Sequence, residues 1–275
     1  MLPHLQSRLA SIAGALTVAA ACGTALAESP PAMAATEVSQ NWSGYVVTGD
    51  LFRRVSGSWV VPKLSCGNHA KTYSDAWVGL GGFNQGAQAL EQTGTSADCS
   101  SAGRARYSAW YELLPAAAVP IRMKVRAGDK ISGSIAVSGT QVRVVLRNRT
   151  RDTKFSTTKR MSSPDVSSAE WILEAPSDCD NQGNCTPLPL ANFGKIPFTS
   201  AAVTTSNGRT ASISHAGAKV TRLHLSDPAG GEAITSGLSS DGSSFSVRYR
   251  QATVAKSSTK AFRRIGPAGP VGPLR

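Results

Sequence analysis

Short strand-like runs make up most of this chain, and beyond the first 27 residues no window predicts an amphipathic helix. Gly, Ser, Asn and Asp separate the runs, and several runs alternate apolar with polar residues, for example 121–125, 131–137, 141–146 and 244–250. Such alternation is typical of a sheet with one buried and one solvated face. Many short strands at near-regular spacing predict an all-β chain, folded as an antiparallel sandwich or barrel.

A length of 275 residues allows one large all-β domain or two small ones. Because 41% of the residues are hydrophobic and 17% are charged, the chain can bury a core. The net charge of +12 favours acidic partners or surfaces through long-range attraction. The chain has no Lys/Arg-rich helix and no basic, aromatic strand of the RNA-binding type. We therefore expect a solvated basic surface and no nucleic-acid partner.

The N-terminus predicts a secretory signal peptide over residues 1–27. Arg8 supplies the charged flank, residues 12–22 form a short apolar run, and residues 25–27 form a small-x-small cleavage site. The apolar run is too short for a stable membrane span. We therefore expect a secreted protein with no membrane segment after signal cleavage.

The remaining chain divides by composition into a leader, a domain and a tail. The tail is basic, rich in Gly and Pro and free of acidic residues, which predicts disorder. The predicted boundaries are a short leader at 28–37, a β-sandwich domain at 38–252 and the tail at 253–275.

Signal cleavage would leave four cysteines, and an even number in an exported chain predicts two disulfides. Three pairings are possible. We predict Cys66–Cys99, which would staple the region before Gln92, and Cys179–Cys185, which would close a short polar loop. A metal site is disfavoured because the spacings are not CxxC and the four histidines are scattered, so we expect no metal and no cofactor.

Residues 169–174 place two carboxylates in the same phase of an apolar strand. Alternate side chains of a strand share a face, so Glu170 and Glu174 should point one way, while Trp171 and Leu173 point the other. A buried carboxylate is costly unless it is paired or useful. This strand therefore predicts a functional pocket.

Two further stretches support the same pocket. Trp110 and Glu112 share a face of a second strand, and Gln92 lies beside Gly94 in a third. One such Glu would be satisfied by a buried Arg or Lys, but three in Trp-bearing strands indicate a shared site. Carboxylates that share a pocket cannot all ionise cheaply, so at least one pKa should rise and suit acid or base catalysis.

The order of these motifs resembles that of the glutamic peptidases, also called eqolisins or peptidase family G1. The resemblance covers about residues 38–251. It rests on Asn-Trp-Ser-Gly at 41–44, Ala-Trp-Val-Gly-Leu at 76–80, Leu-Glu-Gln-Thr-Gly at 90–94, Ala-Trp-Tyr-Glu at 109–112, Ala-Glu-Trp-Ile-Leu-Glu at 169–174, and Asn-Phe-Gly at 192–194 followed by Phe-Thr at 198–199.

The resemblance implies a secreted, acid-acting endopeptidase with a Gln–Glu dyad, on a two-sheet sandwich of the concanavalin-like or jelly-roll type with a concave active-site face. It carries the dyad onto Gln92 and Glu170. It also implies substrate-binding or supporting roles for Trp42, Trp77, Trp110, Glu112 and Glu174. The partners would be protein or peptide substrates, and we expect a monomer.

Two positions depart from the family pattern and leave the pH optimum open: Gly81, where many members have Asp, and Ser108, where Asp is common. Two other functions stay open from the residues themselves. A glycoside hydrolase would use Glu112 and Glu170 as its carboxylate pair. A lectin-like module would bind a ligand in a Trp-lined groove without turnover.

Overall fold

The computed structural model describes residues 34–67, 70–180, 184–216, 219–251 and residue 265. Nearly all of its regular structure is strand, and the one helical element within those ranges is the 3-10 turn η1 (Ile213–His215). The predicted signal peptide, most of the leader, and the tail apart from Ile265 lie outside the described residues. No helix in the described part of the chain has the length and apolar character needed to span a bilayer.

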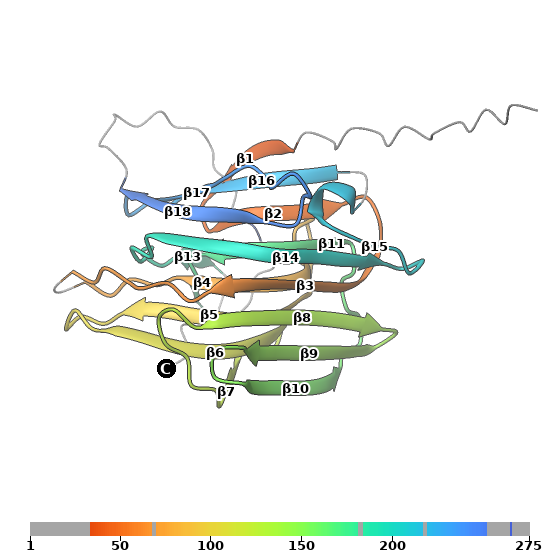
Figure 1. Ribbon diagram of the computed structural model, residues 1–275, viewed down its shortest axis with the longest axis horizontal. Coiled ribbons are helices and arrows are strands. Elements are labelled where there is room, and N and C mark those ends of the chain that lie inside the picture. Colours follow the sequence, from red (N-terminus) through yellow and green to blue (C-terminus); the bar gives the residue numbers. More distant parts are fainter. Residues whose placement is uncertain (1–33, 68–69, 181–183, 217–218, 252–264, 266–275) are drawn as a thin grey trace, which may run out of the picture. The chain divides into compact units, whose positions relative to one another are not determined.

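The strands form a two-layer antiparallel sandwich, as predicted (Figure 1). One layer contains, in order of pairing, β10 (Thr153–Arg160), β9 (Gln141–Asn148), β8 (Lys130–Ser138), β3 (Phe52–Val60), β14 (Lys195–Thr205), β18 (Phe245–Gln251) and β17 (Gly231–Thr235). The other contains β16 (Lys219–Ser226), β2 (Trp42–Thr48), β11 (Ser168–Glu174), β4 (Asp75–Gly81), β5 (Leu90–Cys99), β6 (Ala105–Leu114) and β7 (Val119–Ile121).

The hydrogen-bonded ladder turns back on itself where β17 pairs with β16, so β10 and β7 are its two ends. Both ends lie at the bottom of the view in Figure 1. The smaller strands are β1 (Ala35–Ser39), which pairs in parallel with β16, β15 (Thr210–Ala211), which pairs with β14, and the separate hairpin of β12 (Ser177–Cys179) and β13 (Cys185–Pro187).

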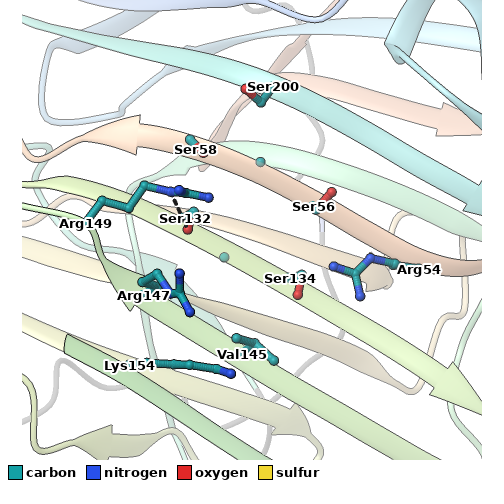
Figure 2. Close-up of a pocket in the computed structure, with 12 residues that line it drawn as sticks. Arg54, Ser56, Ser58, Ser132, Ser134, Val145, Arg147, Arg149, Lys154 and Ser200 are labelled. Carbon is teal, nitrogen blue, oxygen red and sulfur yellow. Dashed lines mark hydrogen bonds between the residues drawn. The ribbon is translucent and has the colours of Figure 1, made fainter. Parts of the chain in front are cut away.

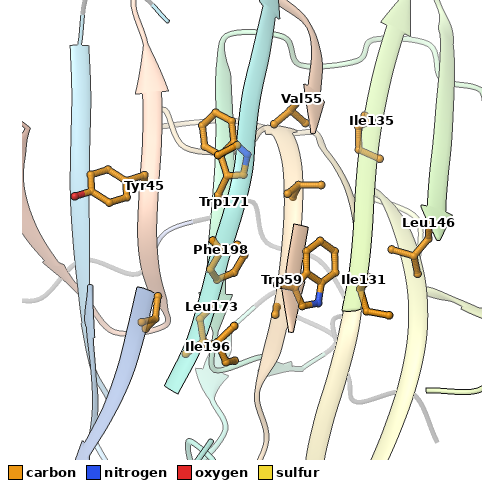
Figure 3. Close-up of a cluster of buried hydrophobic side chains, with 14 of the residues drawn as sticks. Tyr45, Val55, Trp59, Ile131, Ile135, Leu146, Trp171, Leu173, Ile196 and Phe198 are labelled. Carbon is orange, nitrogen blue, oxygen red and sulfur yellow. The ribbon is translucent and has the colours of Figure 1, made fainter. Parts of the chain in front are cut away.

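Strand alternation produces the core between the layers. In β9, Val142, Val144 and Leu146 point inward and are fully buried, while Arg143 and Arg147 point outward. Figure 3 shows the larger inward side chains meeting between the layers, among them Trp59, Trp171, Phe198 and Ile131. The core indoles are also satisfied: Trp59 Nε1 donates to Thr95 Oγ1 at 2.8 Å, and Trp171 Nε1 donates to the carbonyl of Ser56 at 2.8 Å.

Both predicted disulfides are present. Cys66–Cys99 joins the segment after β3 to the end of β5, and Cys179–Cys185 pairs the facing residues of the β12–β13 hairpin. The first crosslink closes a loop with a sequence separation of 33, so it constrains the unfolded chain more than the second, with a separation of 6.

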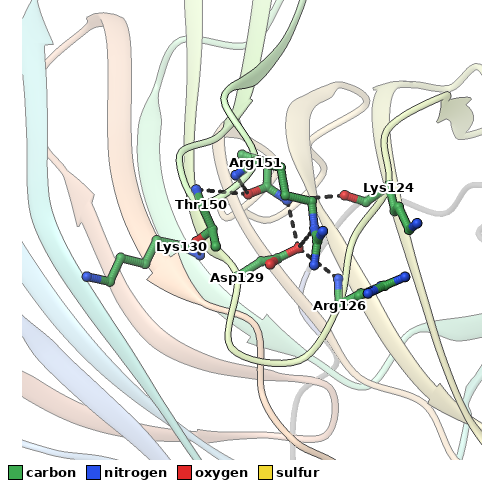
Figure 4. A network of polar contacts seen from close by, with 7 residues as sticks. Lys124, Arg126, Asp129, Lys130, Thr150 and Arg151 are labelled. Carbon is green, nitrogen blue, oxygen red and sulfur yellow. Dashed lines mark hydrogen bonds and ion pairs between the residues drawn. The ribbon is translucent and has the colours of Figure 1, made fainter.

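Asp129 organises the turn between β7 and β8, as its Gly-Asp context suggests (Figure 4). Its Oδ2 atom accepts from Arg151 Nε at 2.7 Å, Asn148 Nδ2 at 2.8 Å and the Arg126 backbone N–H at 2.9 Å. Although burial opposes ionisation, the hydrogen bonds from Arg151 and Asn148 lower the pKa of Asp129. This carboxylate is therefore structural.

A basic hollow of about 330 Å³ lies over β3, β8, β9 and β10 on the outer face of its layer (Figure 2). Serines form much of its lining, and Arg54, Arg147, Arg149 and Lys154 surround them. None of these four cations forms a salt bridge within the described part of the chain. The hollow contains none of the predicted catalytic residues.

Candidate active site

The predicted dyad lies in one row across the second layer. Glu170 of β11 pairs with Gly79 of β4, Gly79 pairs with Gln92 of β5, and Gln92 pairs with Glu112 of β6. Directly paired residues of antiparallel strands share a face. All of these side chains therefore project from the outer face of β2, β11, β4, β5 and β6, which we call the site face.

Gly79 separates Glu170 from Gln92, so no side chain stands between them. A β-carbon at this position would lie 2.9 Å from Trp77 Cζ3, 3.0 Å from the Glu91 carbonyl oxygen and 3.2 Å from Gln92 Cβ. Two strand spacings place the backbones of Glu170 and Gln92 about 10 Å apart. Their side chains can therefore approach one reacting group from opposite sides.

The next row supplies apolar walls. Ile172 pairs with Trp77, Trp77 with Gly94, and Gly94 with Trp110. Trp42 packs edge-to-face on Trp77, with ring centroids 4.9 Å apart. These three tryptophans belong to an apolar cluster on the site face, distinct from the core, made of Trp42, Val46, Trp77, Phe83, Leu90, Trp110, Leu114, Ile172, Leu223 and Ile265.

Glu112 orients the amide of Gln92. Gln92 Nε2 donates to Glu112 Oε2 at 2.7 Å, which leaves the second N–H of the same nitrogen available. Burial raises the pKa of Glu112 to about 8; the hydrogen bond from Gln92 opposes the rise and the charge of Glu174 adds to it. Glu112 is therefore protonated at acid pH.

Glu170 is fully buried, and neither of its oxygens has a hydrogen-bond partner among the described residues. Burial is the main reason that its pKa lies well above the usual 4.5; Ser168 lowers the pKa, while the charges of Asp165 and Glu91 raise it. A carboxyl group in this environment holds a proton at acid pH and is a strong base once ionised.

Glu174 lies on the same face and accepts from Trp77 Nε1 at 2.9 Å. It thus fixes the plane of the indole that packs on Trp42. Its pairing partner Asp75, which the sequence analysis missed, is also buried, and burial together with the charges of Asp98 and Glu174 raises its pKa well above the usual range despite the opposing Ser96 side chain. Counting alternate residues from Trp77 along β4 would have found Asp75.

Asp165 and Glu91 were also missed. A β-carbon on Gly81 would lie 2.5 Å from Asp165 Cβ, and Asp165 Oδ2 accepts from the Gly82 backbone N–H at 3.0 Å. An acid from a distant segment thus packs against the position where many glutamic peptidases have Asp. Glu91 accepts from the Asp165 backbone N–H at 3.1 Å, and burial raises its pKa to about 8. Only the folded chain brings these residues together.

The structure brings all seven predicted site residues onto one face: Gln92, Glu170, Trp42, Trp77, Trp110, Glu112 and Glu174. Each is at most 8% exposed, so the site face is covered. No group of three or more His, Cys, Asp or Glu side chains within the described ranges is placed to hold a metal ion. The roles of the individual residues stay predictions.

Comparisons with known proteins agree on one family. The model described as "Peptidase A4 family" matches residues 40–249. Scytalidopepsin B from Scytalidium lignicola is 33% identical over 188 residues, which cover 65% of this chain and 68% of that protein. Aspergillopepsin-2 from Aspergillus niger is 30% identical over 205 residues, which cover 66% and 69%.

Two solved structures share the fold. Scytalido-glutamic peptidase, crystallised with a peptide-based transition state analog, superposes with a TM-score of 0.62 at 26% identity, covering 77% of this chain and 98% of that chain. Aspergilloglutamic peptidase from Aspergillus niger superposes with a TM-score of 0.52 at 28% identity, covering 65% and 99%.

Proposed function

We propose that this chain, which belongs to the Peptidase A4 family and is a glutamic endopeptidase, cleaves peptide bonds with Glu170 and Gln92 as its catalytic pair. The observation that carries this assignment is the row Glu170–Gly79–Gln92, in which a carboxyl and an amide flank a position without a side chain. A peptide carbonyl above Gly79 would lie between the two groups.

Glu170 is the base and then the acid. Ionised Glu170 takes a proton from a water molecule as the water oxygen bonds to the carbonyl carbon. Protonated Glu170 then gives that proton to the amide nitrogen as the C–N bond breaks and the carbonyl reforms. The proton count balances, and the products are a carboxylic acid and an amine.

Gln92 stabilises the oxyanion that forms in between. Its nitrogen already donates one N–H to Glu112, and the second N–H is free to donate to the developing charge. A donor in this role is worth on the order of 3 kcal/mol in comparable sites. An amide remains a neutral donor at every pH, whereas an ionised carboxylate only accepts.

The two alternatives receive less support. Glu112 and Glu170 are three strands apart in the row, about 14 Å between backbones, with Gln92 and Gly79 between them. The paired carboxyls of a glycosidase flank one glycosidic bond, whereas the Glu112 carboxyl accepts from the Gln92 amide, which lies between it and Glu170 in the row. The family and its relatives are peptidases, which disfavours both the glycosidase and a binding module without turnover.

Protein or peptide substrates follow from the family. We further propose that the enzyme is exported, acts on the acid side of neutrality and is monomeric. Two disulfides support export, because such bonds persist in oxidising compartments. The raised pKa of Glu112, about 8, supports activity on the acid side, because Glu112 is then neutral beside Gln92.

The test is proteolysis of a denatured protein by the wild type and two variants, Glu170→Gln and Gln92→Ala, from acid to mildly alkaline pH. We expect a loss of at least about 10³-fold in kcat/KM for Glu170→Gln and about 10²–10³-fold for Gln92→Ala. Circular dichroism must show an intact fold in both. Unchanged proteolysis in both folded variants would refute the assignment.

A further inference from the structure

Ile265 is buried in the apolar cluster of the site face, although it belongs to a segment whose composition predicts a disordered tail. It is 3% exposed and shares the cluster with Trp42, Trp77 and Trp110. Residues 252–264 separate it from the end of β18 along the chain. A residue from the C-terminal region therefore lies in the apolar cluster that borders the row of Gln92 and Glu170.

A single side chain, Asn41, binds both backbone polar groups of Ile265. Asn41 Nδ2 donates to the Ile265 carbonyl at 2.8 Å, and the Ile265 N–H donates to Asn41 Oδ1 at 3.0 Å. A neighbouring β-strand satisfies an extended peptide in the same way, with one donor and one acceptor. These contacts recognise the backbone alone and would serve any extended peptide.

Asn41 is held in place by bonds that do not involve Ile265. It is 1% exposed, its carbonyl accepts from the Ala175 N–H at 2.8 Å, and Ser39 Oγ donates to its Oδ1 at 3.1 Å. These bonds connect it to the end of β11, the strand that carries Glu170. Asn41 is thus a rigid anchor for a peptide rather than a flexible surface amide.

The cluster and the neighbouring row together contain polar groups suited to a peptide. The indole nitrogens of Trp42 and Trp110 are buried donors with no hydrogen-bond partner among the described residues, and the same holds for both oxygens of Glu170. A site that serves only to bury an isoleucine needs none of these. Peptide carbonyls and a scissile amide would use them.

We propose that the apolar cluster and Asn41 form a binding position for a branched aliphatic residue of an extended peptide, and that Ile265 of the same chain occupies it as an intramolecular competitive inhibitor. This assignment rests on the proposed function. It gives the substrate a branched aliphatic residue at this position, and it makes Ile265 the group that occupies the covered site. Because Ile265 is tethered, its effective concentration is on the order of 1 mM.

The kinetic test compares full-length wild type, Ile265→Ala and the matched control Val271→Ala, which shortens another branched residue of the same C-terminal region. Intact mass must first show that each protein retains residue 275. We expect Ile265→Ala to lower KM for a short peptide substrate about tenfold with kcat unchanged, and Val271→Ala to leave both constants unchanged. A tenfold change corresponds to a dissociation constant of about 0.1 mM for the free segment.

The binding test adds a peptide of residues 262–268 to Glu170→Gln proteins, which cannot cleave it, and follows tryptophan fluorescence. We expect binding at about 0.1 mM to the Glu170→Gln/Ile265→Ala double variant, about tenfold weaker binding to Glu170→Gln alone, and none by a peptide with Ala in place of Ile265. Equal affinity of both proteins for the peptide, or no binding, would overturn the inference.

The two arms separate this inference from the proposed function. Absence of turnover in every variant would count against the peptidase assignment and leave the binding comparison to decide the inference. Turnover with identical KM for wild type and Ile265→Ala would preserve the peptidase and overturn the inhibitor. A loss of thermal stability in Ile265→Ala without a change in KM would assign Ile265 a purely structural role and also overturn it.

Discussion

Two carboxyl groups of the site face, Glu170 and Glu112, have raised pKa values because both are buried. Base catalysis needs ionised Glu170, so kcat/KM should fall as the pH drops through its pKa, which lies above the ordinary 4.5. Above about pH 8 Glu112 ionises beside Gln92 and places a negative charge near the oxyanion. We therefore expect a bell-shaped profile of kcat/KM against pH.

The profile can be checked with a short peptide substrate, and Glu112→Gln is the matched variant. This variant keeps a hydrogen-bonding group next to Gln92 but cannot ionise, so its alkaline limb should disappear while its acid limb remains. An acid limb well below pH 4 in the wild type would contradict the environment described for Glu170.

Gly79 leaves the reacting position open, so it should tolerate no side chain. In Gly79→Ala the new methyl group would crowd Trp77 and the Glu91 carbonyl. We expect the free energy of unfolding to fall by about 1–3 kcal/mol. We also expect kcat/KM to fall in the protein that remains folded, because the methyl group would occupy the place of the substrate carbonyl. Gly237→Ala is the control, because its β-carbon would meet no atom within 4 Å. Equal activity of the two variants would contradict the close approach at Gly79.

At the scale of elements, Asp129 connects the start of β8 to the turn after β9. In Asp129→Ala, Arg151, Asn148 and the Arg126 N–H lose an acceptor. We expect a loss of about 2–3 kcal/mol in urea unfolding, since a buried carboxylate with charged and neutral donors is removed. Asp129→Asn retains an acceptor and should lose less. No difference between Asp129→Ala and wild type would show that the turn forms without this carboxylate.

Strand alternation predicted which residues of each element share a face, and this was enough for much of the site. The opposite orientations of Glu170 and Trp171 in β11, and the shared face of Trp110 and Glu112 in β6, both follow from a period of two. The all-β class followed for the same reason. The ordered motifs added the dyad assignment.

Register between distant strands could not be predicted in this way. The row that aligns Glu170 with Gly79 and Gln92 depends on which residues of β11, β4 and β5 pair, and a shift of one residue would reverse a whole strand. Likewise, the contact of Asn41 with Ile265 joins residues 224 positions apart, and no local pattern encodes it.

At the scale of the whole molecule, several buried carboxyls share one pH dependence. Burial raises the pKa of Asp98 to about 7 and those of Glu91 and Glu112 to about 8, and it raises those of Asp75 and Glu170 as well. Between the ordinary pKa and the raised one, the folded chain binds more protons than the unfolded chain. The part of the folding stability that these carboxyls contribute is therefore fully present below about pH 4, and it is lost as the pH rises through their raised pKa values.

We expect the free energy of unfolding to fall between about pH 5 and about pH 8, with a slope of up to about 1.4 kcal/mol per pH unit for each group that titrates. Urea unfolding in about 0.2 M salt measures it, since salt reduces the opposing repulsion among the excess positive charges at low pH. Glu91→Gln removes one such group and should flatten the slope. A stability that rises across this range would contradict the shared burial effect.

The two ends of the strand ladder also affect how copies of this protein meet. The last strand on one side, β10, carries Lys154, Lys159 and Arg160 at exposed positions, and the last on the other side, β7, has three residues with Pro120 at its centre. A second copy that paired its own β10 with this β10 would bring the cations of both strands together. At the other edge, Pro120 of β7 has no backbone N–H to donate to an added strand. An open sandwich with such edges resists edge-to-edge aggregation without closing into a barrel.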